Sequence, residues 1–468
     1  MKKISIIVFI IFAFLALVIG INHEPWADEA QSWIIARDAS VGEIIWDISR
    51  YEGTFPLWFL TIKLFISLGL QYEYFFIIPI IISLIGLLVF LKGVKAPTIV
   101  KVLVPFTYYI FYQYTIVARS YCYLFLALSI WAIYYKDREK KFLQYTLSLV
   151  LLSMISMHGM VISGVLGILF VKELINKKKV KEIVSVSTIC LCTWIIECIV
   201  LLPRMDLYMN VALSHSVMNV VWTALSTIFV GSNIIETLFS GIGVALTIIM
   251  VIYLIRIKEK SICITSLCVI AFMYLIRLVS HHLGIIYLVI LFGVLVNYDL
   301  LKSKYKLFER LFITMLVLYI SYTGISSIND FKGNYSAAKQ IATYIEENNI
   351  DKSEIYRFGY KQVAILPYFE SNLFANTEKT IYEWKQSNTD FYDYVNFDEE
   401  MIKEKNKDSY PEYILVEKEN TDKISLINEM IQNTGKYDLI YSAEGKLYYK
   451  NTFVDTENFN LYKLINNN

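Results

Sequence analysis

The chain has 468 residues, of which 56% are hydrophobic and only 18% are charged. Soluble proteins are about 45–50% apolar and about 25% charged. Because the apolar residues also come in long unbroken runs, the sequence excludes an ordinary soluble protein and predicts a polytopic α-helical membrane protein. The formal net charge of +1 gives no sign of a nucleic-acid partner. All six cysteines lie inside apolar runs, which favours packing over a disulfide framework.

The first apolar run, residues 4–21, follows Lys2 and Lys3. It is longer than the apolar core of a signal peptide, which has about 7–15 residues. We therefore expect an uncleaved first helix with both lysines in the cytoplasm, and cleavage is the alternative. The polar loop of residues 22–55 then faces outward. Within it, residues 30–51 mix tryptophans and isoleucines with charges, which predicts helices lying at the membrane surface.

Further apolar runs follow, and together with the first run they give about eleven to thirteen potential transmembrane segments. They lie at residues 56–70, 74–91, 102–117, 121–135, 142–157, 160–171, 183–202, 238–255, 262–279, 283–296 and 311–325. Basic turns separate several of these runs, and the positive-inside tendency predicts that such turns are cytoplasmic. They lie at residues 92–95, 136–141, 172–181 and 297–310. If every run crossed the membrane, the basic turns would not all fall on the cytoplasmic side. One short run is therefore expected to be a half-span or a re-entrant helix.

The composition changes abruptly at Asn329, where the chain becomes rich in Lys, Glu, Asn, Asp and Tyr. We therefore divide it into a transmembrane module, residues 1–328, and a soluble α/β domain, residues 329–468, which we expect outside the membrane on the side of the loop of residues 22–55. Helices are predicted at residues 336–347, with Ser336 as the N-cap, and at residues 422–432. Strands are predicted at residues 354–359, 412–416, 437–441 and 446–450, with the last two as a hairpin.

Charged side chains and histidines gather at the expected outward turns. They are Asp28, Glu29, Arg37, Arg50, Glu52, Arg119, His158, Arg204, His215, His281 and His282. Carboxylates at a membrane edge are functional-site hypotheses by default, because they are expensive to keep there. Acids that accept a proton, facing cations that hold a phosphate, suit the displacement of a lipid phosphate from a sugar by an acceptor hydroxyl, with inversion. In the alternative interpretation, Asp28 and Glu29 lie in solvent at the start of a helix, where acids are favourable, and each arginine binds lipid headgroups.

Several of these residues stand in motifs that resemble those of a known enzyme class. The motifs are Asp28-Glu29-Ala30 with Ala36-Arg37, Tyr51-Glu52-Gly53-Thr54-Phe55-Pro56-Leu57, Ala118-Arg119-Ser120-Tyr121, Ser280-His281-His282-Leu283-Gly284 and Tyr335-Ser336-Ala337-Ala338-Lys339. In order and spacing they resemble the polytopic glycosyltransferases of the GT-C fold. The best-known branches of that class are the protein O-mannosyltransferases and the lipid A aminoarabinose transferases.

The resemblance implies a glycosyltransferase of the cell membrane that takes a sugar from a polyprenyl-phosphate donor and passes it to a lipid, glycan or protein acceptor on the outer face. It implies Asp28 and Glu29 as catalytic acids, with Asp28 as the leading base. It also implies that Glu52 either binds a divalent metal or orients the acceptor. With the outward polar set, the residues expected to bind substrate are Arg37, Glu52, Arg119, His158, His281 and His282.

Three other functions stay open at this stage. The first is a transporter or flippase for lipid-linked glycans. The absence of an internal sequence repeat and the place of the acids at a membrane edge speak against it. The second is a cell-envelope glycan polymerase or ligase that uses the same lipid-linked donors. The third is a membrane scaffold whose soluble domain binds a partner.

Overall fold

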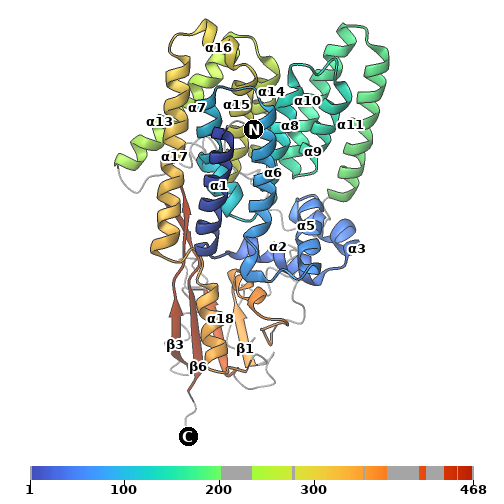
Figure 1. Cartoon of the computed structure of the whole chain (residues 1–468). Helices are drawn as coiled ribbons and strands as arrows, with labels where there is room; N and C mark the ends of the chain where they lie inside the picture. Colours follow the sequence, from blue (N-terminus) through green and yellow to red (C-terminus); the bar gives the residue numbers. More distant parts are fainter. Residues whose placement is uncertain are drawn as a thin grey trace.

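In a computed structural model of the chain, the structure describes residues 3–201, 234–276, 280–351, 354–376, 411–417, 437–450 and 452–465. A long helical module carries a smaller α/β domain at one end (Figure 1). The longer helices of the module are α1 Lys3–Asn22, α2 Ala27–Asp38, α5 Leu57–Ser67, α6 Ile77–Gly93, α8 Tyr123–Tyr135, α9 Phe142–Ser153, α10 Met157–Asn176, α11 Val180–Leu201, α13 Ile234–Arg256, α14 Lys260–Ile276, α15 Leu283–Val296 and α17 Phe308–Lys332. The expected site residues Arg204 and His215 and the expected helix at residues 422–432 lie outside the described residues.

Within the described ranges, five helical segments are long and apolar enough to cross a membrane. They are Lys3–Asn22, Tyr72–Gly93, Met157–Asn176, Val180–Leu201 and Phe308–Lys332. A sixth span forms if α15 and the short α16, Tyr298–Lys304, are counted as one helix bent by 71°. Ile10 and Phe14 on α1 and Ile195 on α11 are 57–63% exposed. Because a soluble protein would bury such side chains, these helices indicate a multi-pass membrane protein.

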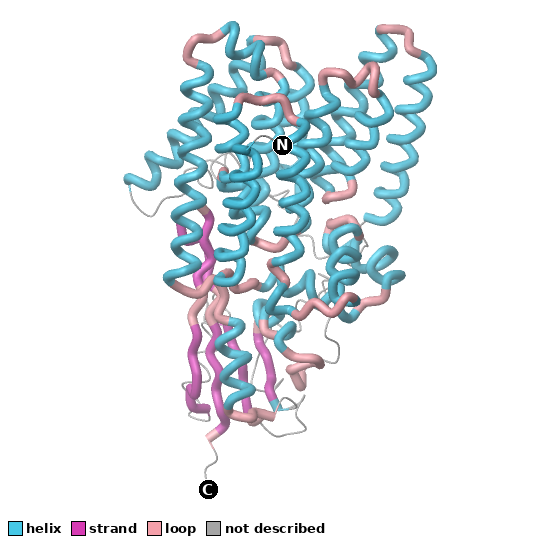
Figure 2. The backbone as a smooth tube through the Cα atoms, in the orientation of Figure 1, coloured by secondary structure: helices cyan, strands magenta, loops and turns pink. Residues whose placement is uncertain are grey.

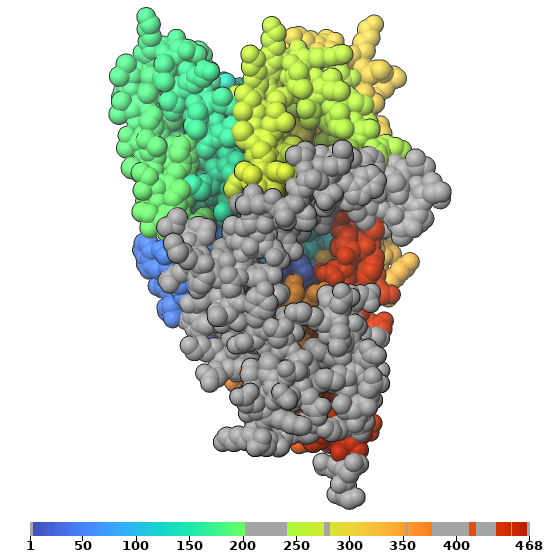
Figure 3. All heavy atoms as spheres, turned by 180° about the vertical axis from the view of Figure 1, so that it is seen from behind, coloured from blue at the N-terminus to red at the C-terminus, as the bar shows by residue number. Residues whose placement is uncertain are grey.

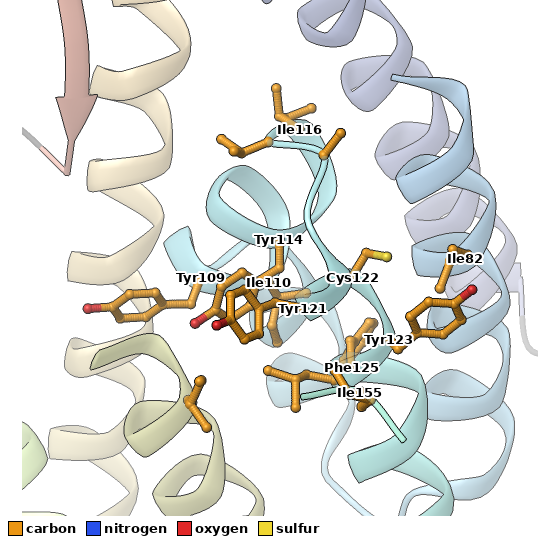
Figure 4. Close-up of a cluster of buried hydrophobic side chains, with 14 of the residues drawn as sticks. Ile82, Tyr109, Ile110, Tyr114, Ile116, Tyr121, Cys122, Tyr123, Phe125 and Ile155 are labelled. Carbon is orange, nitrogen blue, oxygen red and sulfur yellow. The ribbon is translucent and has the colours of Figure 1, made fainter. Parts of the chain in front are cut away.

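The apolar run at residues 102–117 does not form one continuous helix. The chain is helical in α7, Thr98–Leu103, passes through a 3₁₀ turn, Val104–Phe106, and continues as a π-helix, η4, over Tyr109–Ile116. Pro105 explains the break, because proline has no N–H for the helix ladder and its ring clashes with the preceding turn. Every residue of η4 is buried, and Figure 4 shows Tyr109, Ile110 and Tyr114 from this segment inside the module.

In the described part of the α/β domain, helix α18, Ala338–Glu347, accompanies a four-stranded sheet. The strand order is β1–β2–β6–β3, in which β1 and β2 are parallel and the other pairs are antiparallel. Their bounds are β1 Ile355–Phe358, β2 Tyr413–Glu417, β3 Tyr437–Ala443 and β6 Phe459–Leu464. Strands β1, β2 and β3 confirm three of the predicted strands within a few residues, and β6 was not predicted. The fourth predicted strand, residues 446–450, is found in a second sheet as β4, Lys446–Tyr449. Helix α18 begins with Ala337 at the N-cap, and Ser336, the predicted cap, instead accepts a hydrogen bond from the Ala338 N–H at 3.1 Å.

The predicted hairpin between residues 437–441 and 446–450 is wrong. Strand β3 pairs with β6, whereas β4, Lys446–Tyr449, pairs with β5, Thr452–Thr456, in a separate two-stranded sheet. The turn between β3 and β4 hydrogen-bonds to other parts of the chain instead of closing a hairpin. Its Gly445 N–H donates to Asn458 at 2.9 Å, and the next N–H donates to the Asn334 carbonyl.

The β4–β5 hairpin reaches out of the α/β domain into the helical module (Figure 2). At its tip, the Lys450 N–H donates to the Tyr108 hydroxyl at 2.9 Å, and the Lys450 carbonyl accepts from Ser326 of α17. The ammonium group of Lys450 lies 5.2–5.8 Å from the ring centroids of Tyr109, Tyr319, Tyr322 and Tyr449. Contacts of a cation with aromatic faces at this range are attractive. The hairpin therefore fastens the soluble domain to the module.

The two ends of the helical module differ in chemistry. Helix α16 and the turn between α10 and α11 lie at the end far from the β-strands (Figure 1). Seen from behind, the residues of α10 and α11 lie at the top of the molecule, and the visible C-terminal residues lie in its middle and lower parts (Figure 3). The far end carries the basic turns and their ion pairs, such as the part-buried pair of Arg138 with Glu173 and the more exposed pair of Lys302 with Glu309. The end next to the α/β domain carries the loop of residues 22–55.

Candidate functional site

An ion pair between Asp28 and Arg119 is the centre of the polar region at the domain end of the module. Asp28 stands in the first turn of α2, where the positive end of the helix favours a carboxylate. Arg119 lies in the turn between η4 and the 3₁₀ helix η5, Ser120–Cys122, and its Nη1 pairs with Asp28 Oδ2. The side chains are 24% exposed for Arg119 and 33% for Asp28. Both side chains therefore keep part of their surface accessible to solvent.

Glu29, the neighbour of Asp28, faces the interior and is 0% exposed. Its Oε2 accepts hydrogen bonds from the Trp26 N–H and from the His23 ring, each at 3.2 Å. Its Oε1 accepts from the N–H of Ala118 at 2.5 Å. The two adjacent acids that the sequence assigned to catalysis are thus in different environments. Asp28 is partly exposed and paired with one arginine, whereas both carboxylate oxygens of Glu29 are already engaged inside the fold.

Glu52 lies beside this ion pair at the end of the short helix α4, Ser49–Glu52. The Gln31 side chain donates to its Oε1 at 3.2 Å. Burial, and to a smaller extent the charge of Asp28, raise the pKa of Glu52 to about 7, although the Gln31 hydrogen bond and Arg119 act in the opposite direction. The next residue, Gly53, has φ +58°, a left-handed conformation that favours glycine. An added Cβ there would also lie 3.0 Å from the sulfur of Met157.

Three histidine rings gather close to the Arg119 turn. His158 lies in the first turn of α10, and His281 and His282 form most of a 3₁₀ turn before α15. The ring centroid of His282 is 4.3 Å from that of His158 and 4.4 Å from that of His281. Tyr121, two residues after Arg119, lies 5.9–6.4 Å from all three rings. The sequence analysis predicted these histidines as individual binding residues. In the structure, all three rings lie around Tyr121.

Tyr121 also connects this histidine group to the buried core. Its ring lies 5.4 Å from that of Tyr114, and Figure 4 shows the two side by side. The hydroxyl of Tyr114 donates to the His281 carbonyl at 2.8 Å, which fixes the turn that carries the two adjacent histidines. The π-helix therefore supports both the arginine turn and the histidine turn.

Arg37 lies apart from this group. Its guanidinium pairs with the adjacent Asp38 and donates from Nη1 to the Phe369 carbonyl at 2.7 Å. Phe369 belongs to the α/β domain, so Arg37 joins the end of α2 to that domain. Of the six residues expected to bind substrate, five lie at or near the Asp28–Arg119 pair, and Arg37 contacts the soluble domain instead.

The α/β domain holds the loop that carries Asp28 through contacts that no local sequence pattern predicts. Glu457, which is 0% exposed, accepts from the Ala27 N–H at 2.9 Å. Glu24 accepts from the Lys339 N–H at 2.5 Å. Burial, and after it the negative charge of Asp28, raise the pKa of Tyr360 well above its usual value, so this tyrosine lies within electrostatic reach of the site.

Among the residues that the structure describes, no group of three or more His, Cys, Asp or Glu side chains is arranged to hold a metal ion. Next to Glu52, the Gln31 amide donates to the Glu52 carboxyl group and Asp28 is paired with Arg119. We therefore derive no step through a metal.

Comparison of the chain with protein-family models, with curated proteins and with solved structures gave no match.

Proposed function

We propose that the protein is an integral-membrane glycosyltransferase that moves a sugar from a polyprenyl-phosphate donor to an acceptor hydroxyl. The observation that carries this proposal is the partly exposed pair of Asp28 and Arg119, with Glu52 and the histidine group close by. A base next to a cationic surface is what displacement of a sugar from a lipid phosphate requires. The motif resemblance to the GT-C glycosyltransferases points to the same reaction.

In the proposed reaction, Asp28 accepts the proton of the acceptor hydroxyl. The acceptor oxygen forms a bond to the anomeric carbon, and the bond from that carbon to the phosphate oxygen breaks. The electron pair of the broken bond leaves with the polyprenyl phosphate, and a single displacement inverts the anomeric centre. Asp28 suits the role of base better than Glu29, because both oxygens of Glu29 are engaged with His23, Trp26 and Ala118.

Arg119 has the donors to hold the phosphate while it stays paired with the base. Only its Nη1 contacts Asp28. A guanidinium carries five N–H donors in a planar fork, so donors remain for phosphoryl oxygens. The negative charge that grows on the leaving phosphate would meet Arg119 first, and His281 and His282 would lie behind it across Tyr121.

Glu52 is assigned to orientation of the acceptor. With a pKa of about 7, its carboxyl group is close to half protonated at neutral pH. It can therefore accept a hydrogen bond from a sugar hydroxyl or donate one to it. Its place next to Asp28 would present the acceptor oxygen to the base.

We assign the site and the α/β domain to the outer face of the cell membrane. The basic turns lie at the opposite end of the module, as Lys177 and Lys302 illustrate. The positive-inside tendency favours the cytoplasm for that end. A donor that carries a long lipid chain would then enter between the helices from the bilayer, and the acceptor would enter from the side of the soluble domain.

The experiment is to give the purified protein a panel of polyprenyl-phosphate hexoses and pentoses with acceptor lipids, glycans and peptides, and to measure released polyprenyl phosphate. Asp28→Asn should lower the rate by about 10²–10⁴-fold, the usual contribution of a general base. Asp38→Asn, which changes another acid of the same helix, should leave the rate near the wild-type value. If the wild-type protein releases no polyprenyl phosphate from any donor, or if Asp28→Asn retains the full rate, the proposal is wrong.

A further inference from the structure

A buried histidine stands between two carboxylates just behind the proposed site. His23 Nε2 lies 3.2 Å from Glu29 Oε2, and His23 Nδ1 lies 3.3 Å from Asp330 Oδ2. The His23 side chain is 1% exposed, and the side chains of both acids are 0% exposed. These groups come from the loop after α1, from the first turn of α2 and from the last turns of α17. The arrangement ties three elements together at one ring.

The geometry makes the His23 ring a cation. A neutral imidazole has one N–H, so it can donate to only one of the two carboxylates, whereas the imidazolium donates to both. Burial alone would lower the pKa of His23, but the charges of Glu29 and Asp330 and their hydrogen bonds outweigh it and raise the pKa to about 10. The ring of Tyr335, with its centroid 4.6 Å away, covers the histidine from the side of the soluble domain.

The cation acts on the site through Glu29. A hydrogen bond from a charged donor is stronger than one between neutral groups, so the imidazolium holds the Glu29 carboxyl group firmly in place. Oε1 of Glu29 takes the N–H of Ala118 at 2.5 Å, and Ala118 immediately precedes Arg119. The backbone from which Arg119 extends is thus held by the same carboxylate that holds His23.

We propose that His23, fixed by Asp330, is a positioning residue that holds Glu29 on the backbone of Ala118 and so sets Arg119 against Asp28. His23 touches none of the groups expected to react, so it acts only through Glu29. The part of this inference that concerns the donor phosphate rests on the proposed function. The part that concerns the placement of Arg119 does not depend on it.

A double-mutant cycle separates positioning from a merely structural role. The measurement is the binding of a fluorescent polyprenyl phosphate to wild type, His23→Gln, Arg119→Ala and the double variant. We expect His23→Gln to weaken binding between about 10- and 100-fold, the scale of a misplaced catalytic group. The double variant should bind no worse than Arg119→Ala alone, because the effect of His23 passes through that arginine. Losses that multiply in the double variant would overturn the proposal.

The matched control is Glu24→Gln, which changes the residue next to His23. Glu24 contacts the backbone N–H of Lys339 and takes no part in the contacts of His23 with Glu29 and Asp330. Its substitution removes one contact that holds the loop, and should weaken binding of the probe much less than His23→Gln does. A loss as large as that of His23→Gln would mean that any disturbance of this loop weakens binding, and it would count against a specific role of His23.

A second measurement tests the placement of Arg119 without any reference to function. Phenylglyoxal modifies exposed arginines, and peptide mass spectrometry assigns the rate to each one. In His23→Gln, and in Asp330→Asn as a second variant, Arg119 should react several-fold faster, while Arg138 at the far end should be unchanged. An unchanged rate at Arg119 in both folded variants would overturn the proposal. If wild type fails to bind polyprenyl phosphate but Arg119 reacts faster in the variants, the proposed function fails and the positioning role stands.

Discussion

The two ends of the helical module differ in how deeply their most buried charges lie. At the far end, ion pairs such as Lys302 with Glu309 have side chains that are 52% and 32% exposed. At the domain end, His23, Glu29 and Asp330 are almost completely buried. Exposed pairs contribute little to stability, and buried ions lose hydration that their mutual attraction only partly replaces. We infer that the far end is organised for solubility and orientation, and that the domain end keeps its charges for chemistry.

The largest effect that this comparison predicts comes from Arg119→Ala. The substitution leaves Asp28 without its partner and removes the first donor for the leaving phosphate. We expect the rate of polyprenyl-phosphate release to fall by about 10²–10³-fold, which is the usual cost of losing one such donor. Arg138→Ala removes an arginine that also pairs with a carboxylate, but at the far end, and should cost less than threefold. If both variants lost the same share of the release rate, the two ends of the module would not differ in their role in the reaction.

A smaller effect is expected for Glu52→Gln, and its sign depends on pH. The folded-state pKa of Glu52 is about 7, above the ordinary value of 4.5, so the folded protein binds this proton more tightly than the unfolded chain. The free energy of unfolding of wild type therefore falls as the pH rises from about 4.5 to about 7. Glutamine does not titrate. The free energy of unfolding of Glu52→Gln, taken relative to that of wild type, should therefore increase by about 1–3 kcal/mol when the pH is raised from 5 to 8.

Thermal unfolding in detergent at the two pH values measures this gain. Glu24, whose pKa burial also raises to about 7, is present in both proteins and cancels in the comparison. If the difference between Glu52→Gln and wild type is the same at pH 5 and pH 8, the carboxyl group of Glu52 is not held in the environment described here.

The smallest effect is predicted for the far end. Glu309 pairs with Lys302 on the surface and also accepts from Tyr298 at 2.7 Å. Because exposed pairs are screened by water and salt, Glu309→Gln should shift the melting temperature by less than about 3 °C and leave the release rate unchanged. A shift as large as that of a buried variant such as Asp330→Asn would show that the far end is also held by its charges.

The sequence predicted the architecture well where composition decides it. Long apolar runs predicted a helical membrane protein, and turn residues between short apolar stretches predicted the strands of the soluble domain. The run at residues 102–117 was expected to be one helix because hydropathy averages over Pro105, whereas the broken π-helical path depends on local backbone chemistry. The predicted hairpin is wrong because strand pairing depends on contacts across the whole sheet. Ala443 of β3, for example, pairs with Phe459 of β6.

For the candidate site, the sequence supplied Asp28, Glu52, Arg119 and the three histidines as separate residues at turns. It did not predict which of these residues contact each other, or which other residues hold them in place. His23 meets Asp330 across 307 residues of sequence, and the Ala27 N–H meets Glu457 across 430. A lone histidine after a helix and a lone acid near the C-terminus carry no local signal, because their partners are brought together only by the fold.

One measurement tests the central claim, that the Asp28–Arg119 end binds the lipid phosphate, most directly. The far end offers a competing place, a hollow of about 390 Å³ lined by Lys92, Lys101 and the start of α1. A polyprenyl phosphate with a photoreactive group next to the phosphate would be cross-linked to the protein in membranes and the attached peptides identified. We predict cross-links within residues 118–123 and 280–284. Cross-links confined to the segments around Lys92 and Lys101 would contradict the claim.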